Sequence, residues 1–227
     1  MSLDKTAFLF DLDGTLVDSV YQHVLAWKEA LDAEDIPISV WRIHRRIGMS
    51  GGLFLHMLLR ETGRSISEEA LLRLRHRHAA AYGRLAAADA VRPLPGAREL
   101  LDFLSANQFP WAIATSGRME TARHNLTALG VDPAIVPVVT RDQVRHAKPD
   151  PDLFIAAAER LGVDIRNALV IGDSVWDMLA GQRARAIGIG RLAAGYGTTE
   201  LQQAGALRVY EDPADMLRNI DEIASRD

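Results

Sequence analysis

Four short polar clusters are predicted to lie at the ends of buried strands. They are Asp11-Leu12-Asp13-Gly14-Thr15, Thr115-Ser116-Gly117, Lys148-Pro149-Asp150 and Gly172-Asp173-Ser174-Val175-Trp176-Asp177. In parallel α/β sheets, ligands bind beyond the carboxyl ends of the strands. We therefore expect the four clusters to gather at one edge of a sheet and to form a single site.

The carboxylates in these clusters are typical of a metal site. Asp11 and Asp13 follow an apolar run directly, and burying a carboxylate is costly unless it meets a cation. Mg²⁺ takes oxygen ligands in octahedral geometry. Asp173 would bring a further oxygen, and Asp177, one helical turn on, could hold a ligand or an ordered water of the metal. The alternative is that these aspartates are ordinary turn residues and helix caps.

The other two clusters suit a phosphoryl group. A small hydroxyl and free backbone N–H groups at Thr115-Ser116-Gly117 can hold phosphate oxygens. Lys148 can neutralise both a carboxylate nucleophile and a phosphoryl oxygen. The alternatives are a plain turn between strand and helix for the first and a surface lysine for the second.

The elements that must position these clusters alternate along the chain. Apolar runs that predict strands lie at residues 7–10, 111–114, 135–139 and 168–171, with weaker signals at 187–189 and, as an edge strand, at 207–210. Helical patterns lie between them at residues 96–107, 119–129 and 150–161. Strands that alternate with helices predict crossover connections, so the expected fold class is α/β with a Rossmann-like parallel sheet core.

Residues 17–92 break this alternation. No strand is evident there, and apolar residues recur at helical spacing at Val20, Val24, Trp27 and Leu31. We expect an all-helical cap domain inserted after strand 1, with hinges at residues 16–18 and 91–95. The predicted domains are a core of residues 1–16 and 93–227 and a cap of residues 17–92.

A later part of the same stretch carries a possible helix start. Ser65 and Glu68 have the spacing of a capping box, which predicts that a long helix begins there. The basic run at residues 73–78 spreads over several faces of that helix, so a solvated surface is expected for it.

The composition excludes several classes of protein. The chain has 227 residues and no cysteine, so disulfides, thiolate zinc sites and cysteine nucleophiles are excluded. A formal net charge of −4 provides no overall basic surface for nucleic acid. No apolar run reaches the roughly 18 residues that a membrane helix needs. We expect a cytoplasmic monomer or homodimer that binds neither nucleic acid nor membranes.

Together and in order, the four clusters resemble the motifs of the haloacid dehalogenase-like hydrolases. The first motif extends through Leu16-Val17-Asp18-Ser19, and the helical insertion is similar to that family's helical cap. The resemblance covers nearly the whole chain and is closest to the branch of phosphoglycolate phosphatase and β-phosphoglucomutase. It implies an Mg²⁺-dependent phosphatase for a small phosphorylated metabolite, either phosphoglycolate or a sugar phosphate.

The resemblance also implies a role for each matched residue. Asp11 is the nucleophile that becomes an aspartyl phosphate, and Asp13 is the acid that protonates the leaving oxygen and then the base that activates water. Mg²⁺ is held by Asp11, the main-chain carbonyl of Asp13 and Asp173, with Asp177 close by. The phosphoryl oxygens are held by Thr115, Ser116, Gly117 and Lys148.

Three other functions are alternatives for a protein of this fold. A phosphomutase would use the same aspartyl phosphate but pass the phosphoryl group to a second hydroxyl instead of water. A dehalogenase would typically lack the second aspartate, so Asp13 argues against it. A non-catalytic binding protein on this fold would be expected to have lost a nucleophile or a metal ligand, and none is missing.

Residues outside the four motifs are candidates for substrate binding. His23 lies near the first hinge, where the mutase branch has a histidine that assists acid–base chemistry; a partly buried helix histidine is the alternative. Arg46 suits a carboxylate or a second phosphate and is expected to contact the substrate. Gly51 stands where the mutase branch has a further cation, and Arg118 could replace that cation.

Overall fold

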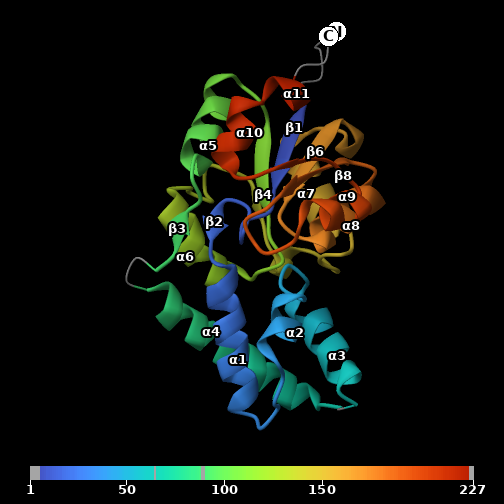
Figure 1. Cartoon of the computed structure of the whole chain (residues 1–227). Coiled ribbons are helices and arrows are strands. Elements are labelled where there is room, and N and C mark those ends of the chain that lie inside the picture. Colours follow the sequence, from blue (N-terminus) through green and yellow to red (C-terminus); the bar gives the residue numbers. More distant parts are fainter. Residues whose placement is uncertain (1–5, 64, 88–89, 225–227) are drawn as a thin grey trace.

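The computed structural model describes residues 6–63, 65–87 and 90–224, which form two lobes (Figure 1). The larger lobe contains a six-stranded parallel sheet in the order β5-β4-β1-β6-β7-β8. Its strands are β1 (Ala7–Phe10), β4 (Trp111–Ala114), β5 (Val138–Val139), β6 (Ala168–Gly172), β7 (Ile187–Arg191) and β8 (Ala206–Tyr210). The predicted α/β fold with a parallel sheet core is confirmed.

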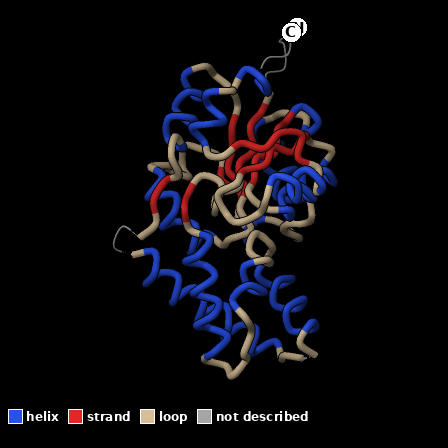
Figure 2. Tube along the Cα trace, viewed as in Figure 1, coloured by secondary structure: helices blue, strands red, loops and turns tan. Residues whose placement is uncertain are grey.

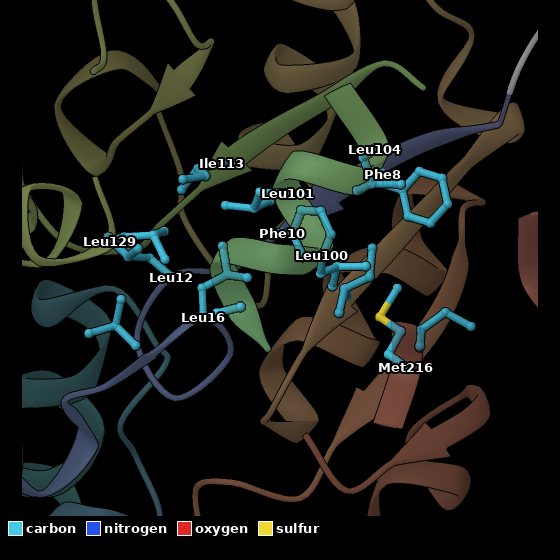
Figure 3. Packing of buried hydrophobic residues seen from close by; sticks show 14 of the residues in the cluster. Phe8, Phe10, Leu12, Leu16, Leu100, Leu101, Leu104, Ile113, Leu129 and Met216 are labelled. Carbon is cyan, nitrogen blue, oxygen red and sulfur yellow. The ribbon is translucent and has the colours of Figure 1, made fainter. Parts of the chain in front are cut away.

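Helices cover both faces of the sheet because the strand residues alternate between two apolar layers. Phe8 and Phe10 face one layer, and Ala7 and Leu9 face the other. Figure 3 shows the two phenylalanines among leucines of α5 (Ala97–Ala106). The first layer also contains residues of α6 (Met119–Leu129) and α10 (Pro213–Arg218), and the second contains residues of α7 (Asp152–Leu161) and α8 (Val175–Ala184).

Short elements complete the larger lobe. They are α9 (Thr198–Gln203), α11 (Asp221–Ala224) and the 3₁₀ turns at Arg141–Gln143 and Ile165–Asn167. Across the described ranges, no helix is both long and apolar enough to cross a membrane.

One predicted strand is shorter than expected. Only Val138 and Val139 of residues 135–139 belong to β5, and Ile135 is 81% exposed. The backbone N–H groups of Ile135 and Val136 donate to the carbonyl of Asp132, so this segment is a turn. Pro137 cannot donate to a sheet, and the strand begins after it.

The smaller lobe contains helices and loops between its two connections to the sheet (Figure 2). Its helices are α1 (Val20–Asp32), α2 (Val40–His44), α3 (Gly51–Glu61) and α4 (Glu68–Ala86). Their shared core includes the four residues that predicted the first helix, Val20, Val24, Trp27 and Leu31, together with Phe54, Leu58 and Leu74. We call this part of the chain the helical lobe.

The two connections are short strands, which the sequence did not predict. β2 (Val17–Asp18) and β3 (Arg92–Pro93) pair in antiparallel fashion, with Val17 opposite Pro93. The first connection is also fixed to the loop after β1, because the backbone N–H of Gly14 donates to the carbonyl of Val17 over 2.8 Å. The first connection to the helical lobe is therefore hydrogen-bonded to the loop that carries Asp11 and Asp13.

The predicted helix start at Ser65 is wrong. α4 begins at Glu68, and the residue that caps it is Ser67, whose hydroxyl accepts a hydrogen bond from the backbone N–H of Ala70 over 3.3 Å. An N-cap must directly precede the first helical residue, and Ser65 lies too far upstream.

Candidate active site

The polar clusters converge because their strands are neighbours in the sheet. β1 lies between β4 and β6, and the chain leaves these strands at Asp11, Thr115 and Asp173 respectively. Parallel strands place their carboxyl ends at one edge. Asp177 stands in the first turn of α8, and Lys148 lies in the loop before α7.

Three aspartates form a buried group at this edge. One carboxylate oxygen each from Asp11, Asp173 and Asp177 lies within 4.8 Å of the other two. Lys148 is fully buried beside them. Its ammonium is paired with Asp11 and lies 2.8 Å from Asp177 Oδ1. Three buried carboxylates therefore face one buried ammonium, which leaves an excess of negative charge.

The pKa values reflect this excess. Burial, together with the charges of Asp177 and Asp13, raises the pKa of Asp11 to about 7 against the attraction of Lys148. Burial and the charges of Asp177 and Asp11 also raise the pKa of Asp173 well above its ordinary value, although Thr15 donates a hydrogen bond to Asp173 over 2.9 Å. A group of buried oxygen donors with surplus negative charge fits a hard divalent cation.

The two carboxylate oxygens of Asp177 make different contacts. Its Oδ2 accepts hydrogen bonds from the backbone N–H and the hydroxyl of Ser174, and its backbone N–H donates to the Ser174 hydroxyl oxygen, so the two residues form a capping box at the start of α8. Its Oδ1 faces Lys148 and the aspartate group. The helix-cap role and a role beside a metal are thus compatible.

The carboxylate of Asp13 is not part of the aspartate group. Its Oδ1 accepts a hydrogen bond from Ser19 over 2.6 Å and another from the side-chain amide of Asn125, and it lies 3.1 Å from His23 Nε2. Burial alone would raise the pKa of Asp13, but His23 and the hydroxyl of Ser19 lower it below its ordinary value. These donors favour the ionised carboxylate, which is the form a general base requires.

A second histidine, His78, contacts His23 on the side of the ring away from Asp13. The sequence predicted a solvated surface for this histidine. That interpretation is wrong for His78, which is 8% exposed. His78 Nε2 lies 3.2 Å from His23 Nδ1, and its ring stacks on Trp27 at 4.0 Å. Burial lowers the pKa of His78 well below its ordinary value, so this imidazole is neutral. The spacing of Leu74, His78 and Tyr82 along one helix face was the signal for its burial.

Tyr82 and Asn125 also support Asp13, and neither was predicted. Tyr82 is fully buried, stacks on His23 at 3.8 Å and donates a hydrogen bond to Asn125 Oδ1 over 2.6 Å. The amide of Asn125, in α6, then reaches Asp13. Residues of both lobes thus hold the same carboxylate.

The loop after β4 faces a cavity of about 310 Å³, which is also lined by Asp11 and Asp13. Thr115 Oγ1 accepts a hydrogen bond from the backbone N–H of Gly117 over 2.9 Å. The hydroxyl of Ser116 is buried and has no hydrogen-bond partner among the described residues. This loop can therefore offer a free hydroxyl to a bound anion.

Arg46 and Arg118, the two predicted substrate contacts, both line the cavity. Arg46 is paired with Glu61, and its guanidinium lies 6.0 Å from the centre of the Trp176 ring. Arg118 is paired with Asp142 over 2.6 Å. Arg75, in the basic run expected to be solvated, lines the same cavity.

The chain is similar in sequence to known phosphatases. Hexitol phosphatase A of Escherichia coli is 33% identical over 78% of this chain and 78% of its own length. Phosphoglycolate phosphatase of Rhodospirillum rubrum is 31% identical over 92% of this chain and 88% of its own.

Solved structures give the same result for the fold. A crystal structure described as that of a hydrolase from Pseudomonas syringae is 58% identical, covers 97% of this chain and 100% of that one, and superposes with a TM-score of 0.95. β-Phosphoglucomutase of Clostridium difficile shares the fold, with 24% identity, a TM-score of 0.82 and coverage of 96% of both chains. Residues 5–185 match the family model described as haloacid dehalogenase-like hydrolase. The protein belongs to the haloacid dehalogenase-like hydrolase family.

Proposed function

We propose that this protein is an Mg²⁺-dependent phosphatase that hydrolyses a small phosphorylated metabolite. The observation that supports it most is the position of Asp11, which lies in the buried aspartate group, pairs with Lys148 and lines the cavity beside the Thr115–Gly117 loop. The names of the relatives agree with this class of substrate, since they include phosphatases for hexitol phosphate, phosphoglycolate and fructose 1-phosphate.

The proposed reaction has two displacements at phosphorus. In the first, a carboxylate oxygen of Asp11 attacks phosphorus, the bond from phosphorus to the ester oxygen breaks, and protonated Asp13 gives its proton to that oxygen. In the second, ionised Asp13 takes a proton from water as the water attacks phosphorus and releases Asp11. The hydrogen bonds from Ser19 and Asn125 favour the ionised state of Asp13, which the second step uses.

The remaining residues of the site counter negative charge. A phosphoryl group carries negative charge on its oxygens, so an anionic nucleophile reaches it only where cations reduce the repulsion. Lys148 would supply one positive charge beside Asp11. Mg²⁺ bound by Asp11, Asp173 and the Asp13 carbonyl, with Asp177 nearby, would supply a Lewis acid that polarises the phosphoryl oxygens. The free hydroxyl and the backbone N–H of Ser116 would hold those oxygens.

We further propose that residues 17–92 act as a cap that closes over the cavity. In this structure the helical lobe contacts the sheet lobe: the backbone N–H of Ser50 donates to the carbonyl of Lys148 over 3.2 Å, and the hydroxyl of Tyr196 donates to the carbonyl of Arg45 over 3.0 Å. Closure of this kind excludes water and selects substrate. In this arrangement His23 already lies 3.1 Å from Asp13.

A phosphomutase is the second candidate, and the contact between His23 and Asp13 is the observation that favours it. A mutase needs Asp13 to deprotonate a sugar hydroxyl, and a neighbouring imidazole would assist that step. Gly51 argues against it, because the mutase branch has a cation at that place.

A direct test is phosphate release from a panel of phosphorylated metabolites, measured with Mg²⁺ and with excess EDTA. We expect release that depends on the metal, for at least one of phosphoglycolate and the hexose monophosphates. Interconversion of hexose phosphates without net phosphate release would favour the mutase. Release that is unchanged by EDTA would contradict the proposed metal site.

The raised pKa of Asp11 predicts how Mg²⁺ binding depends on pH. A proton on Asp11 competes with the metal below its pKa of about 7, so the apparent dissociation constant should rise about tenfold or more per pH unit below that value. In the metal-free protein the unfolded chain binds fewer protons than the folded one between about pH 4 and pH 7, so Asp11 should lower the stability as pH rises through that window.

Calorimetric titration with Mg²⁺ across this range would measure the affinity, and thermal unfolding in EDTA would measure the stability. An affinity that does not change between mildly acidic and mildly basic pH would contradict the prediction.

A further inference from the structure

The cavity holds a group of cations that phosphoryl transfer to Asp11 does not use. Arg75 of α4, Arg118 at the start of α6 and Arg141 in the turn after β5 all line it. Arg75 is not among the main contributors to the pKa of Asp11 or Asp13, whereas Arg118 and Arg141 act on Arg75. The arginines thus form a group of their own, which we call the arginine group.

Arg75 differs from the other members in having no partner among the described residues. Arg118 is paired with Asp142 over 2.6 Å, and Arg141 donates to the carbonyl of Val144 over 2.7 Å. Within the described ranges, Arg75 makes no hydrogen bond or ion pair, although Glu68 attracts it from a greater distance. Its helix neighbours Arg73 and Arg77 both pair with Glu34 on the outside of the helical lobe.

Gly52, in the first turn of α3, leaves room for the guanidinium of Arg75. A Cβ atom at Gly52 would lie 2.9 Å from Arg75 Nη2, which is closer than real Cβ contacts. Arg75 therefore reaches from α4 to the first turn of α3, into the space that a side chain at residue 52 would fill.

The electrostatic setting of Arg75 favours an anion. Burial and the charge of Arg118, with a smaller contribution from Arg141, lower the pKa of Arg75 below its ordinary value against the attraction of Glu68. Besides Asp11 and Asp13, the cavity is lined by one carboxylate, that of Glu120. The three cations of the arginine group therefore outnumber the carboxylates beside them in this part of the cavity. A guanidinium offers a planar, bidentate fit to a carboxylate or a phosphate.

We propose that Arg75, with Arg118 and Arg141, binds a second anionic group of the substrate, separate from the phosphoryl group that Asp11 attacks. This inference rests on the proposed phosphatase function and narrows its substrate class. The favoured substrates are phosphorylated acids and bisphosphates, in preference to monophosphates of neutral sugars.

The test compares esters that differ only in a second charge. Suitable pairs are phosphoglycolate with ethyl phosphate, and fructose 1,6-bisphosphate with fructose 1-phosphate, so that the two pairs distinguish a carboxylate from a phosphate. Arg75→Gln should lower kcat/KM for the doubly charged member of one pair by about 10- to 100-fold, mainly through KM, because one charge-assisted contact is lost. The singly charged member should change less than about threefold.

Variants of the neighbouring residues serve as matched controls. Arg73→Gln and Arg77→Gln remove the same charge from the same helix but lie outside the cavity, and they should leave the preference for the second charge unchanged. Arg75→Lys should restore part of that preference. An equal loss for both members of each pair, or no loss for either, would overturn the proposal.

A binding measurement separates this proposal from the proposed function. Phosphonoacetate and 4-phosphonobutyrate carry a carboxylate at two distances from a phosphorus group that cannot be hydrolysed, and ethylphosphonate carries none. Wild-type protein should bind one of the two acids more tightly than ethylphosphonate, and Arg75→Gln should abolish the difference. That result would uphold the arginine group even if no ester were hydrolysed. Equal binding of all three ligands to the wild-type protein would overturn it.

Discussion

Replacing Asp11 with asparagine should lower kcat by about 10⁴-fold or more, because the variant lacks the oxygen anion that, in the proposed reaction, attacks phosphorus. The amide has nearly the same shape and can still fill the space beside Lys148, so the cavity should keep its form. In the metal-free protein the change also removes one of three buried carboxylates that face a single ammonium. We therefore expect the thermal stability in EDTA to be unchanged or higher.

Single-turnover phosphate release, with unfolding followed on the same sample, would check both parts of this prediction. Asp32→Asn is a matched control, since Asp32 is an exposed partner of Lys28 on α1; it should leave kcat unchanged. Trapping a phosphorylated protein in the wild type and not in Asp11→Asn would support the covalent step. A variant that folds and retains more than a few per cent of kcat would show that Asp11 is not the nucleophile.

Replacing Lys148 with methionine should lower the free energy of unfolding in EDTA by about 3–5 kcal/mol, because it leaves buried carboxylates without their cation. Lys148 is fully buried and is paired with Asp11 and Asp177, so water cannot replace the lost charge. Mg²⁺ should recover part of the lost stability, since it would compensate the same carboxylates. Activity should fall as well, because the repulsion between Asp11 and the phosphoryl group would rise.

Urea unfolding with and without Mg²⁺ would measure these changes. Lys28→Met is the control, because Lys28 forms an exposed pair with Asp32 and should contribute less than about 1 kcal/mol. If Lys148→Met were as stable as the control variant in EDTA, the aspartates of the site would have to be protonated, and the buried ion pair would contribute nothing to stability.

Most residues around Asp11 were accessible to sequence reasoning because they lie at the end of a strand; Lys148 is the exception, since it lies in the loop before α7 and not directly after β5 as predicted. Asp11 and Asp173 directly follow the buried strands β1 and β6, so the position of each carboxylate follows from the strand assignment and the parallel topology. The fold could be predicted in the same way, since apolar runs that alternate with helices leave few arrangements. Among the strands, β5 is shorter than the predicted 135–139, and the two-residue strands β2 and β3, which are too short for a periodic pattern, were not predicted.

Two features could not be predicted in this way: the residues that hold Asp13 in place, and the arginine group. His78 and Arg75 lie three residues apart on one helix and both line the cavity, yet His78 is buried against His23 whereas Arg75 faces Arg118 and Arg141. Their roles depend on how α4 packs between α1 and α6, which is a property of the whole fold. Asn125 likewise reaches Asp13 only because Tyr82, from the other lobe, fixes its amide.

The paired strands β2 and β3 have a consequence for how such a protein can change its substrate over evolution. Because Val17 and Asp18 pair with Pro93 and Arg92, the chain leaves the sheet lobe and returns to it at adjacent points. An insertion whose ends meet in this way can be exchanged as a module without altering the sheet itself. Selection can thus rebuild the surface that carries Arg75 while Asp11 and Lys148 keep the same chemistry. The exchange has one constraint: any replacement module must bring its own donors to Asp13, as Ser19 and His23 do here.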